Sequence, residues 1–137
     1  MSGHDDDGER QFALTTAARG ETVVVGVSGE LDLHSAPRLM EAVDEAMQRT
    51  ELVVIDLTEV DFLGSSGLGV LANLATRATV PTSHRQGGPR PPADLRVVAP
   101  PDQRAVTRPW EAMSLQQILP LYPTVDDAIE GGLATEG

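Results

Sequence analysis

Cysteine is absent from this 137-residue sequence, which excludes a disulfide, a thiolate nucleophile and any cysteine metal site. The histidines are too scattered to suggest a metal site, and no cofactor is expected; they are His4, His34 and His84. No apolar run approaches the roughly 20 residues that a membrane helix needs. The polar, acidic N-terminus also lacks the apolar region of a signal peptide. The sequence therefore predicts a cytoplasmic protein with no membrane partner.

Basic residues are scarce, since 10 Lys and Arg stand against 21 Asp and Glu, giving a formal net charge of -11 at pH 7. Nucleic acids are held largely by Lys and Arg on phosphate, so this balance argues against a nucleic-acid partner. It suits a basic protein partner or a chain that stays soluble and monomeric, or at most a weak dimer. Aromatic residues make up 3% of the chain and hydrophobic residues 40%, so the core must be aliphatic.

Apolar patterning predicts alternating strands and helices, hence an α/β layer of helices against a mixed sheet. The expected strands are 12–16, 22–28, 52–57, 94–99 and 117–122, and the expected helices are 35–49, 65–78, 101–112 and 125–129. Gly29 is expected to end the second strand and Pro109 to break or kink the third helix. Residues 1–11 are expected to be a disordered tail, 81–93 a long Pro- and Gly-rich loop, and 132–137 a frayed tail after glycines 131 and 132.

Helix caps are expected at Ser35 and Thr124, because each precedes a helical pattern. Ser65 and Ser66 stand where a buried strand turns directly into a helix. The first turn of a helix has unpaired N–H groups and the positive end of the macrodipole, so it could hold a phosphate on Ser65. Taken alone, these residues favour the simpler interpretation of a capping serine and glycines that permit a tight turn.

A set of ordered motifs adds to this interpretation. They are Gly29-Glu30-Leu31-Asp32, Ala36-Pro37 at a helix start, the segment 52–71 (LVVIDLTEVDFLGSSGLGVL) and the segment 105–129 (AVTRPWEAMSLQQILPLYPTVDDAI). Together they resemble the STAS domain, and in particular the bacterial anti-sigma factor antagonists, over residues 12–131. The resemblance implies a single domain with a mixed sheet of four or five strands and helices packed mainly on one face.

The same resemblance implies a function. Such antagonists bind an anti-sigma factor, usually a serine kinase, and so release a sigma factor. The kinase phosphorylates a serine at the start of the helix, which is Ser65 here, and a serine phosphatase restores binding. The family pattern is Asp-Ser-Ser/Thr-Gly, and this sequence departs from it at Gly64. The residues expected to contact the partner are Glu30, Asp32, Ser65, Ser66, Gly67, Leu68 and Gly69.

The same residues are also compatible with other interpretations. Asp32 fits a partner contact and a turn-stabilising residue about equally, whereas a solvated turn is favoured for Glu30. The domain could instead be a STAS accessory subunit of a transporter, in which Ser65 need not be modified, or a self-assembling scaffold module. An enzyme is disfavoured, because 64–67 (GSSG) is one residue short of Gly-x-Ser-x-Gly and no Lys follows the glycines as in a P-loop. Acidic residues 56, 59 and 61 fit solvated charges better than catalytic carboxylates.

Overall fold

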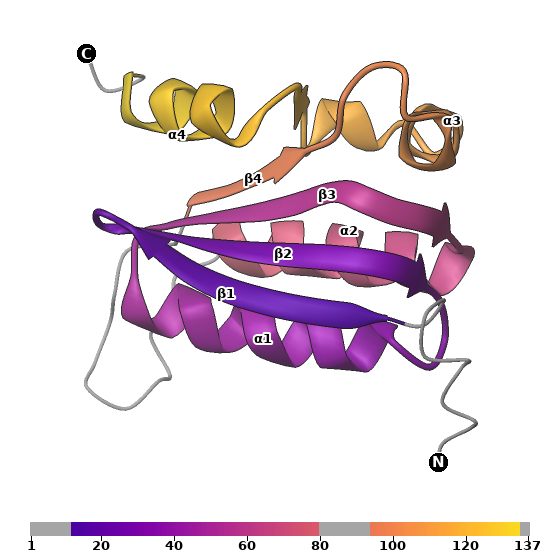
Figure 1. Ribbon diagram of the computed structural model, residues 1–137, viewed down its shortest axis with the longest axis horizontal. Coiled ribbons are helices and arrows are strands. Elements are labelled where there is room, and N and C mark those ends of the chain that lie inside the picture. Colours follow the sequence, from indigo (N-terminus) through magenta and orange to yellow (C-terminus); the bar gives the residue numbers. More distant parts are fainter. Residues whose placement is uncertain (1–11, 80–93, 135–137) are drawn as a thin grey trace.

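The computed structural model describes residues 12–79 and 94–134 (Figure 1). The segments expected to be a disordered tail (1–11) and a long loop (81–93) lie outside the described residues, as does 135–137. The order of strands and helices follows the sequence prediction. The elements are β1 (Ala13–Arg19), β2 (Thr22–Leu31), α1 (Ala36–Arg49), β3 (Leu52–Leu63), α2 (Ser65–Thr79), β4 (Asp94–Val98), α3 (Arg104–Ala112), the 3-10 helix η2 (Leu115–Gln117), β5 (Leu121–Tyr122) and α4 (Val125–Ala134).

The strands form one mixed sheet in the order β1-β2-β3-β4-β5. Only β1 and β2 pair antiparallel, because a two-residue turn joins them, and Gly20 takes the positive φ that such a turn favours. The other neighbours pair parallel, and between them the chain crosses over through helices. The predicted mixed sheet is therefore confirmed, with five strands.

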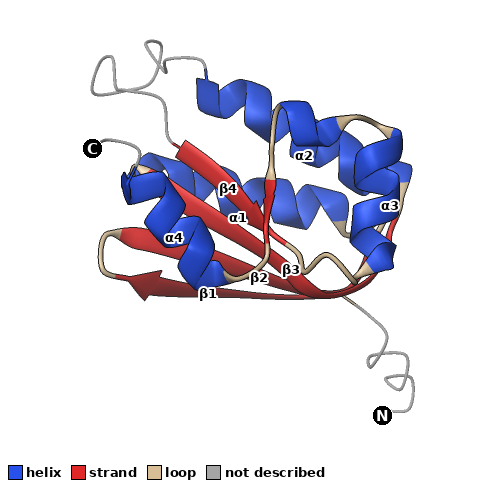
Figure 2. Ribbon diagram, turned by 90° about the horizontal axis from the view of Figure 1, so that it is seen from above, coloured by secondary structure: helices blue, strands red, loops and turns tan. Residues whose placement is uncertain are grey.

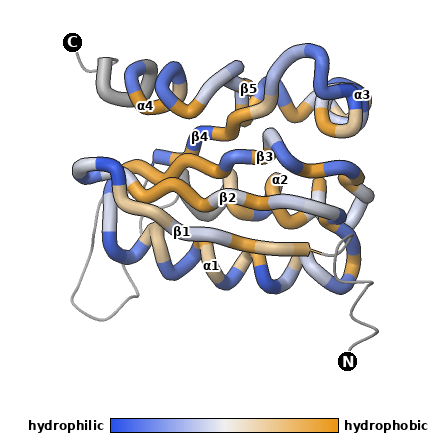
Figure 3. Tube along the Cα trace, viewed as in Figure 1, coloured by the Kyte–Doolittle hydropathy of each residue, from blue (hydrophilic) through white to orange (hydrophobic). Residues whose placement is uncertain are grey.

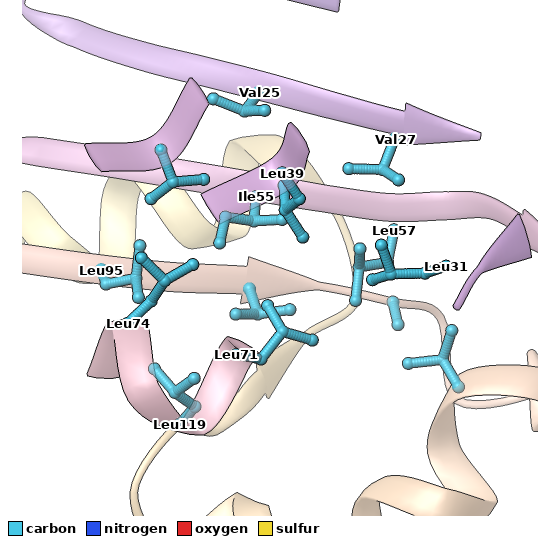
Figure 4. Packing of buried hydrophobic residues seen from close by; sticks show 14 of the residues in the cluster. Val25, Val27, Leu31, Leu39, Ile55, Leu57, Leu71, Leu74, Leu95 and Leu119 are labelled. Carbon is cyan, nitrogen blue, oxygen red and sulfur yellow. The ribbon is translucent and has the colours of Figure 1, made fainter. Parts of the chain in front are cut away.

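The core lies mainly on one face of the sheet, and it is aliphatic as the composition predicts (Figure 4). Val53, Ile55 and Leu57 alternate along β3 and pack with α1, α2 and α3 in one large cluster. Val54 points to the opposite face, where it meets Ala128 of α4 in a small second cluster. Figures 1 and 2 show α4 crossing the sheet on the side away from α1, and Figure 3 shows the apolar residues of β2 to β4 between these layers. Helices thus pack mainly, but not solely, on one face.

Strands β2 and β3 are longer than the sequence pattern predicts. Gly29 does not end β2; it lies inside the strand at φ 89°, next to a register shift, and pairing continues to Leu31. Strand β3 likewise runs past the polar residues after Leu57 to Leu63. Each strand extends because it pairs with the other. The residues of the two extensions show no clear alternation of apolar and polar side chains, so the sequence pattern does not reveal them. Glu30 consequently lies in a strand, whereas a loop was expected.

The C-terminal third departs from the prediction in three places. Helix α3 runs through Pro109 without breaking and ends at Ala112, since one missing N–H costs a single backbone hydrogen bond. Of the residues expected to begin the last strand, Gln117 ends η2 and 118–120 lie between η2 and the strand, so β5 is only Leu121–Tyr122. Helix α4 passes the two glycines at 131 and 132 and reaches Ala134. The Thr124 cap is confirmed, because its Oγ1 accepts the Asp127 N–H at 3.0 Å.

Gln103, which sequence reasoning missed, ties the start of α3 to β3. Its Nε2 donates to the carbonyl oxygens of Leu57 at 2.7 Å and Val60 at 2.9 Å. These carbonyls flank the point where the register of β3 shifts against β2. A bulge leaves backbone groups of the strand ladder without strand partners, and the side-chain amide of Gln103 satisfies two of them.

In the described part of the chain, no helix combines the length and apolar character needed to cross a membrane.

Candidate functional site

The carboxyl ends of β2 and β3 meet at the N-terminus of α2, toward the right in Figure 1. Leu31 pairs with Leu63, and the Gly64 N–H then donates to the Leu31 carbonyl at 3.0 Å. Helix α2 starts at the next residue, Ser65, as predicted. This hydrogen bond joins the end of β2 to the start of α2, which are about thirty residues apart in the sequence. The structure thus brings Glu30 and Asp32 to the same edge of the sheet as Ser65, at the carboxyl ends of β2 and β3.

Ser65 is exposed and Ser66 half-buried in the first turn of α2. The Gly64 carbonyl accepts the Leu68 N–H at 3.0 Å, which places Gly64 in the N-cap position. Glycine has no side chain with which to cap, although the family pattern has Asp, a preferred capping residue, at this position. The first-turn N–H groups therefore have no side-chain cap from residue 64 and could serve an anion on Ser65.

The two glycines of this turn have different surroundings. A Cβ on Gly67 would lie 2.8 Å from Leu31 Cγ and 2.9 Å from both the Leu31 carbonyl oxygen and Leu63 Cδ1. Only glycine lets the helix approach β2 this closely. Gly69 is exposed, and a Cβ there would meet nothing within 4 Å. Leu68 between them is 5% exposed and belongs to the core. Of the residues predicted on α2, Ser65 and Gly69 thus form the outer surface.

Asp32 holds the turn that leads into α1. Its Oδ1 accepts the N–H groups of His34 at 3.0 Å and Ser35 at 3.2 Å, so the carboxylate caps the turn that precedes α1. Ser35 occupies the N-cap position of α1 as expected, but its side chain makes no cap hydrogen bond. Its hydroxyl instead accepts the Asp32 N–H at 2.9 Å and donates to the Glu30 carbonyl at 2.7 Å. The Ser35 N–H is the main cause that lowers the pKa of Asp32; partial burial opposes it, while the Ser35 hydroxyl and His34 add to it.

The side chains around the Asp32 turn are two carboxylates, a histidine, a serine hydroxyl, an arginine and one aromatic ring. Among the described residues, no group of three or more His, Asp and Glu could hold a metal ion. A shallow pocket of about 250 Å³ adjoins the Asp32 turn. Its lining mixes both charge signs and one aromatic ring; the residues are Phe12, Glu30, Asp32, His34, Ser35 and Arg38.

Comparison with known proteins identifies the family. The family model of the STAS domain matches residues 13–80. The anti-sigma-F factor antagonist RsfB of Mycobacterium tuberculosis is 36% identical over 122 residues, which is 88% of each chain. The chain belongs to the STAS family of anti-sigma factor antagonists. The resemblance inferred from the sequence motifs is thereby confirmed.

Solved structures of STAS proteins agree with this assignment. A crystal structure of an anti-sigma factor antagonist from Mycobacterium paratuberculosis superposes with a TM-score of 0.72 at 33% identity, covering 89% of this chain and 94% of that one. The unphosphorylated form of the anti-sigma factor antagonist SpoIIAA has a TM-score of 0.61 at 21% identity, covering 90% and 97%. At that lower identity the likeness shows a shared fold.

Two apolar side chains at the edge of the STAS sheet escaped the sequence reasoning. Phe62 is 51% exposed and Leu33 is 70% exposed, although large apolar side chains are usually buried. Phe62 could have been suspected from the alternation of β3, since its neighbour Leu63 is buried. Nothing in the local pattern singles out Leu33.

The cap at Asp32 predicts a pH-dependent stability. Because its folded pKa is lowered, the carboxylate stabilises the fold above the unfolded pKa of about 3.9 and loses this effect as pH falls through the folded value. The Asp32→Asn variant keeps an acceptor but no charge. We expect its Tm to lie a few degrees below wild type at neutral pH, and this gap to close on acidification.

Thermal unfolding followed by circular dichroism from neutral to acidic pH measures this gap. Asp102→Asn serves as the control, since Asp102 is exposed and its side chain has no hydrogen bond to another described residue. Its Tm should track wild type at every pH. A constant gap for Asp32→Asn would show that the charge does not contribute.

Proposed function

We propose that this protein binds an anti-sigma factor of the serine-kinase type, thereby releases a sigma factor, and is itself switched by phosphorylation of Ser65. It acts by binding, without catalysis of its own, and in the cytoplasm, where sigma factors work. A serine phosphatase would return it to the binding form.

The observation that carries this proposal is the position of Ser65. Its side chain is exposed at the first residue of α2, and Gly64 before it and Gly69 after it present no side chain. A kinase active site could therefore approach the hydroxyl closely. The family supports the rest, because the relatives that match over most of the chain are named anti-sigma factor antagonists.

Gly64, which replaces the family Asp, is compatible with the switch. The N–H groups of the first turn of α2 remain available to a phosphate, and a phosphate on Ser65 would meet no carboxylate from residue 64. The absence of the Asp would affect how the kinase orients the hydroxyl.

Intact mass spectrometry tests the proposal. The purified protein is incubated with ATP and, one at a time, each kinase-type anti-sigma factor encoded by the source genome. We expect a stable complex with at least one of them and the gain of one phosphate, which Ser65→Ala abolishes and Ser66→Ala retains. If no anti-sigma factor forms a complex, the proposed function is wrong. A complex in which Ser65→Ala gains the phosphate equally well would contradict the site alone.

A further inference from the structure

Phe62 stands apart from the other aromatic residues of this aromatic-poor chain. The others are satisfied within the fold, since Trp110 is buried and donates to the Leu119 carbonyl, while Phe12 and Tyr122 each lie against an arginine. Phe62 is half exposed and, among the described residues, has no cation over its ring. A large ring left in water is unfavourable because of the apolar area that it exposes, and exposed apolar side chains that gather in one patch mark interaction sites.

The ring of Phe62 lies beside the residue that precedes Ser65. A Cβ built on Gly64 would be 3.1 Å from Cε2 of Phe62 and 3.4 Å from its Cζ. The ring therefore leans across a glycine, and no side chain separates it from the start of α2. A protein that covers the Ser65 hydroxyl would meet this ring as well.

Leu33 projects from the same edge on a turn that hydrogen bonds hold in place. The Asp32 carboxylate accepts the N–H groups that follow Leu33 in the chain, and the Ser35 hydroxyl closes the turn on the Glu30 carbonyl. Leu33 lies two residues after Leu31, and Phe62 two residues before Gly64. The hydrogen bond between Gly64 and Leu31 thus brings the two exposed apolar residues to one edge.

The charged residues next to Phe62 on β3 and opposite it on β2 are acidic. Asp61 precedes it in β3, Glu30 is its partner across the strands, and Glu59 lies further along β3. Arg38, which lines a pocket with Glu30, lies over the ring of Phe12. Within the described part of the chain, the ion pairs are Arg19–Asp126 and Arg96–Asp94, so none of these three carboxylates is neutralised by a described cation. A partner that covers Phe62 must present Lys or Arg opposite them.

We propose that Phe62 and Leu33 are the apolar anchors of the interface, and that they enter an apolar depression of the anti-sigma factor whose rim is basic. This inference rests on the proposed function and specifies the partner surface. Aromatic side chains near the centre of an interface, surrounded by complementary charges, contribute most of the binding energy in many complexes. The basic rim faces the carboxylates, while the Ser65 hydroxyl lies beside the anchors and faces the kinase nucleotide.

Isothermal titration against the anti-sigma factor that binds wild type tests the anchors. We expect Phe62→Ala to weaken binding about tenfold or more, and Leu33→Ala severalfold. Ile118→Ala is the matched control, because Ile118 is 55% exposed and precedes β5, the outermost strand, which β4 separates from β3. Its affinity should stay within about twofold of wild type. The Tm of each variant is measured in parallel, so that lost binding is separated from lost folding.

The salt dependence tests the basic rim. Wild-type binding should weaken as NaCl is raised, and the double variant Glu30→Gln, Asp61→Asn should show a flatter dependence. If wild type binds while folded Phe62→Ala and Leu33→Ala bind equally well, the anchors are wrong and the proposed function stands. If their affinity drops but the salt dependence is unchanged in the double variant, the basic rim is wrong. A wild-type chain that binds no anti-sigma factor overturns both the function and this interface.

Discussion

Phosphorylated at Ser65, the protein is expected to bind its anti-sigma factor about 100-fold more weakly than the unmodified chain, a loss of about 2.7 kcal/mol. A phosphate adds nearly two negative charges and three acceptor oxygens at the first residue of α2. A kinase holds the phosphates of its nucleotide against the hydroxyl that it modifies. The new dianion would therefore lie next to other phosphates in a closed contact, where repulsion and desolvation both oppose binding.

The phosphate on Ser65 weakens binding through its immediate surroundings, although the partner surface as a whole is expected to attract negative charge. The carboxylates of Glu30 and Asp61 favour a basic rim, and added negative charge at the rim would strengthen binding. At Ser65 the added charge faces the nucleotide, so binding weakens. The sign of the effect thus depends on position, which provides a control within the same chain.

Titration of the anti-sigma factor with enzymatically phosphorylated protein, at fixed salt and with nucleotide present, measures the loss. Ser114→Asp is the control variant, because Ser114 is exposed, follows α3 and has a positive φ of 57° that Asp tolerates. It adds negative charge on the turn between α3 and η2, outside the first turn of α2, and should leave the affinity within about twofold. Equal affinity of the phosphorylated and unmodified forms would rule out phosphorylation as the release signal.

Gly67→Ala is expected to destabilise the fold by about 2 kcal/mol, whereas Gly69→Ala stabilises it by up to about 1 kcal/mol. The added methyl group at position 67 would lie 2.9 Å from the Leu31 carbonyl oxygen, a backbone atom that cannot rotate away. Helix α2 would have to move off β2, which displaces Ser65. At position 69 the methyl group meets open space, so only the better helix propensity of alanine remains.

Urea unfolding of both variants and wild type, compared at equal m-values, measures the two changes. Gly69 is on the outer surface beside Ser65, so a methyl group there would also meet a docked partner. The Gly69→Ala variant therefore distinguishes the effect on fold stability from the effect on partner binding. Binding of the anti-sigma factor is expected to weaken in Gly69→Ala even as the fold becomes more stable. Equal destabilisation by both alanines would mean that helix geometry, and not the contact with β2, requires the glycines.

Much of this architecture could be predicted from local sequence. The β-branched run at 22–28 and the apolar run at 52–57 indicated paired strands, and the stripe of Leu68, Leu71 and Leu74 indicated a helix that starts at Ser65. The Thr124 cap was also predictable, because a hydroxyl capping a helix needs only the next turn of the same chain. The ordered motifs were together specific enough to identify the STAS family, which comparison confirmed.

Features that depend on contacts between distant segments could not be predicted. Strands β2 and β3 extend past Gly29 and Leu57 because each supplies hydrogen-bonding partners for the other. Ser35 holds the predicted N-cap position of α1, but the end of β2 decides what its side chain does, because its hydroxyl donates to the Glu30 carbonyl and makes no cap hydrogen bond.

The sequence by itself determined the class of fold, the family, the aliphatic core and the position of Ser65 at a helix start. These follow from the periodicity of apolar residues and from short motifs, both of which can be recognised without knowledge of tertiary contacts. Only the tertiary structure decided that Gly67 is buried against Leu31 while Gly69 is open, and that Phe62 is exposed while Leu63 is buried. The members of each pair differ in burial although they are near neighbours in the sequence. The reason is that burial depends on which other part of the chain packs against a residue.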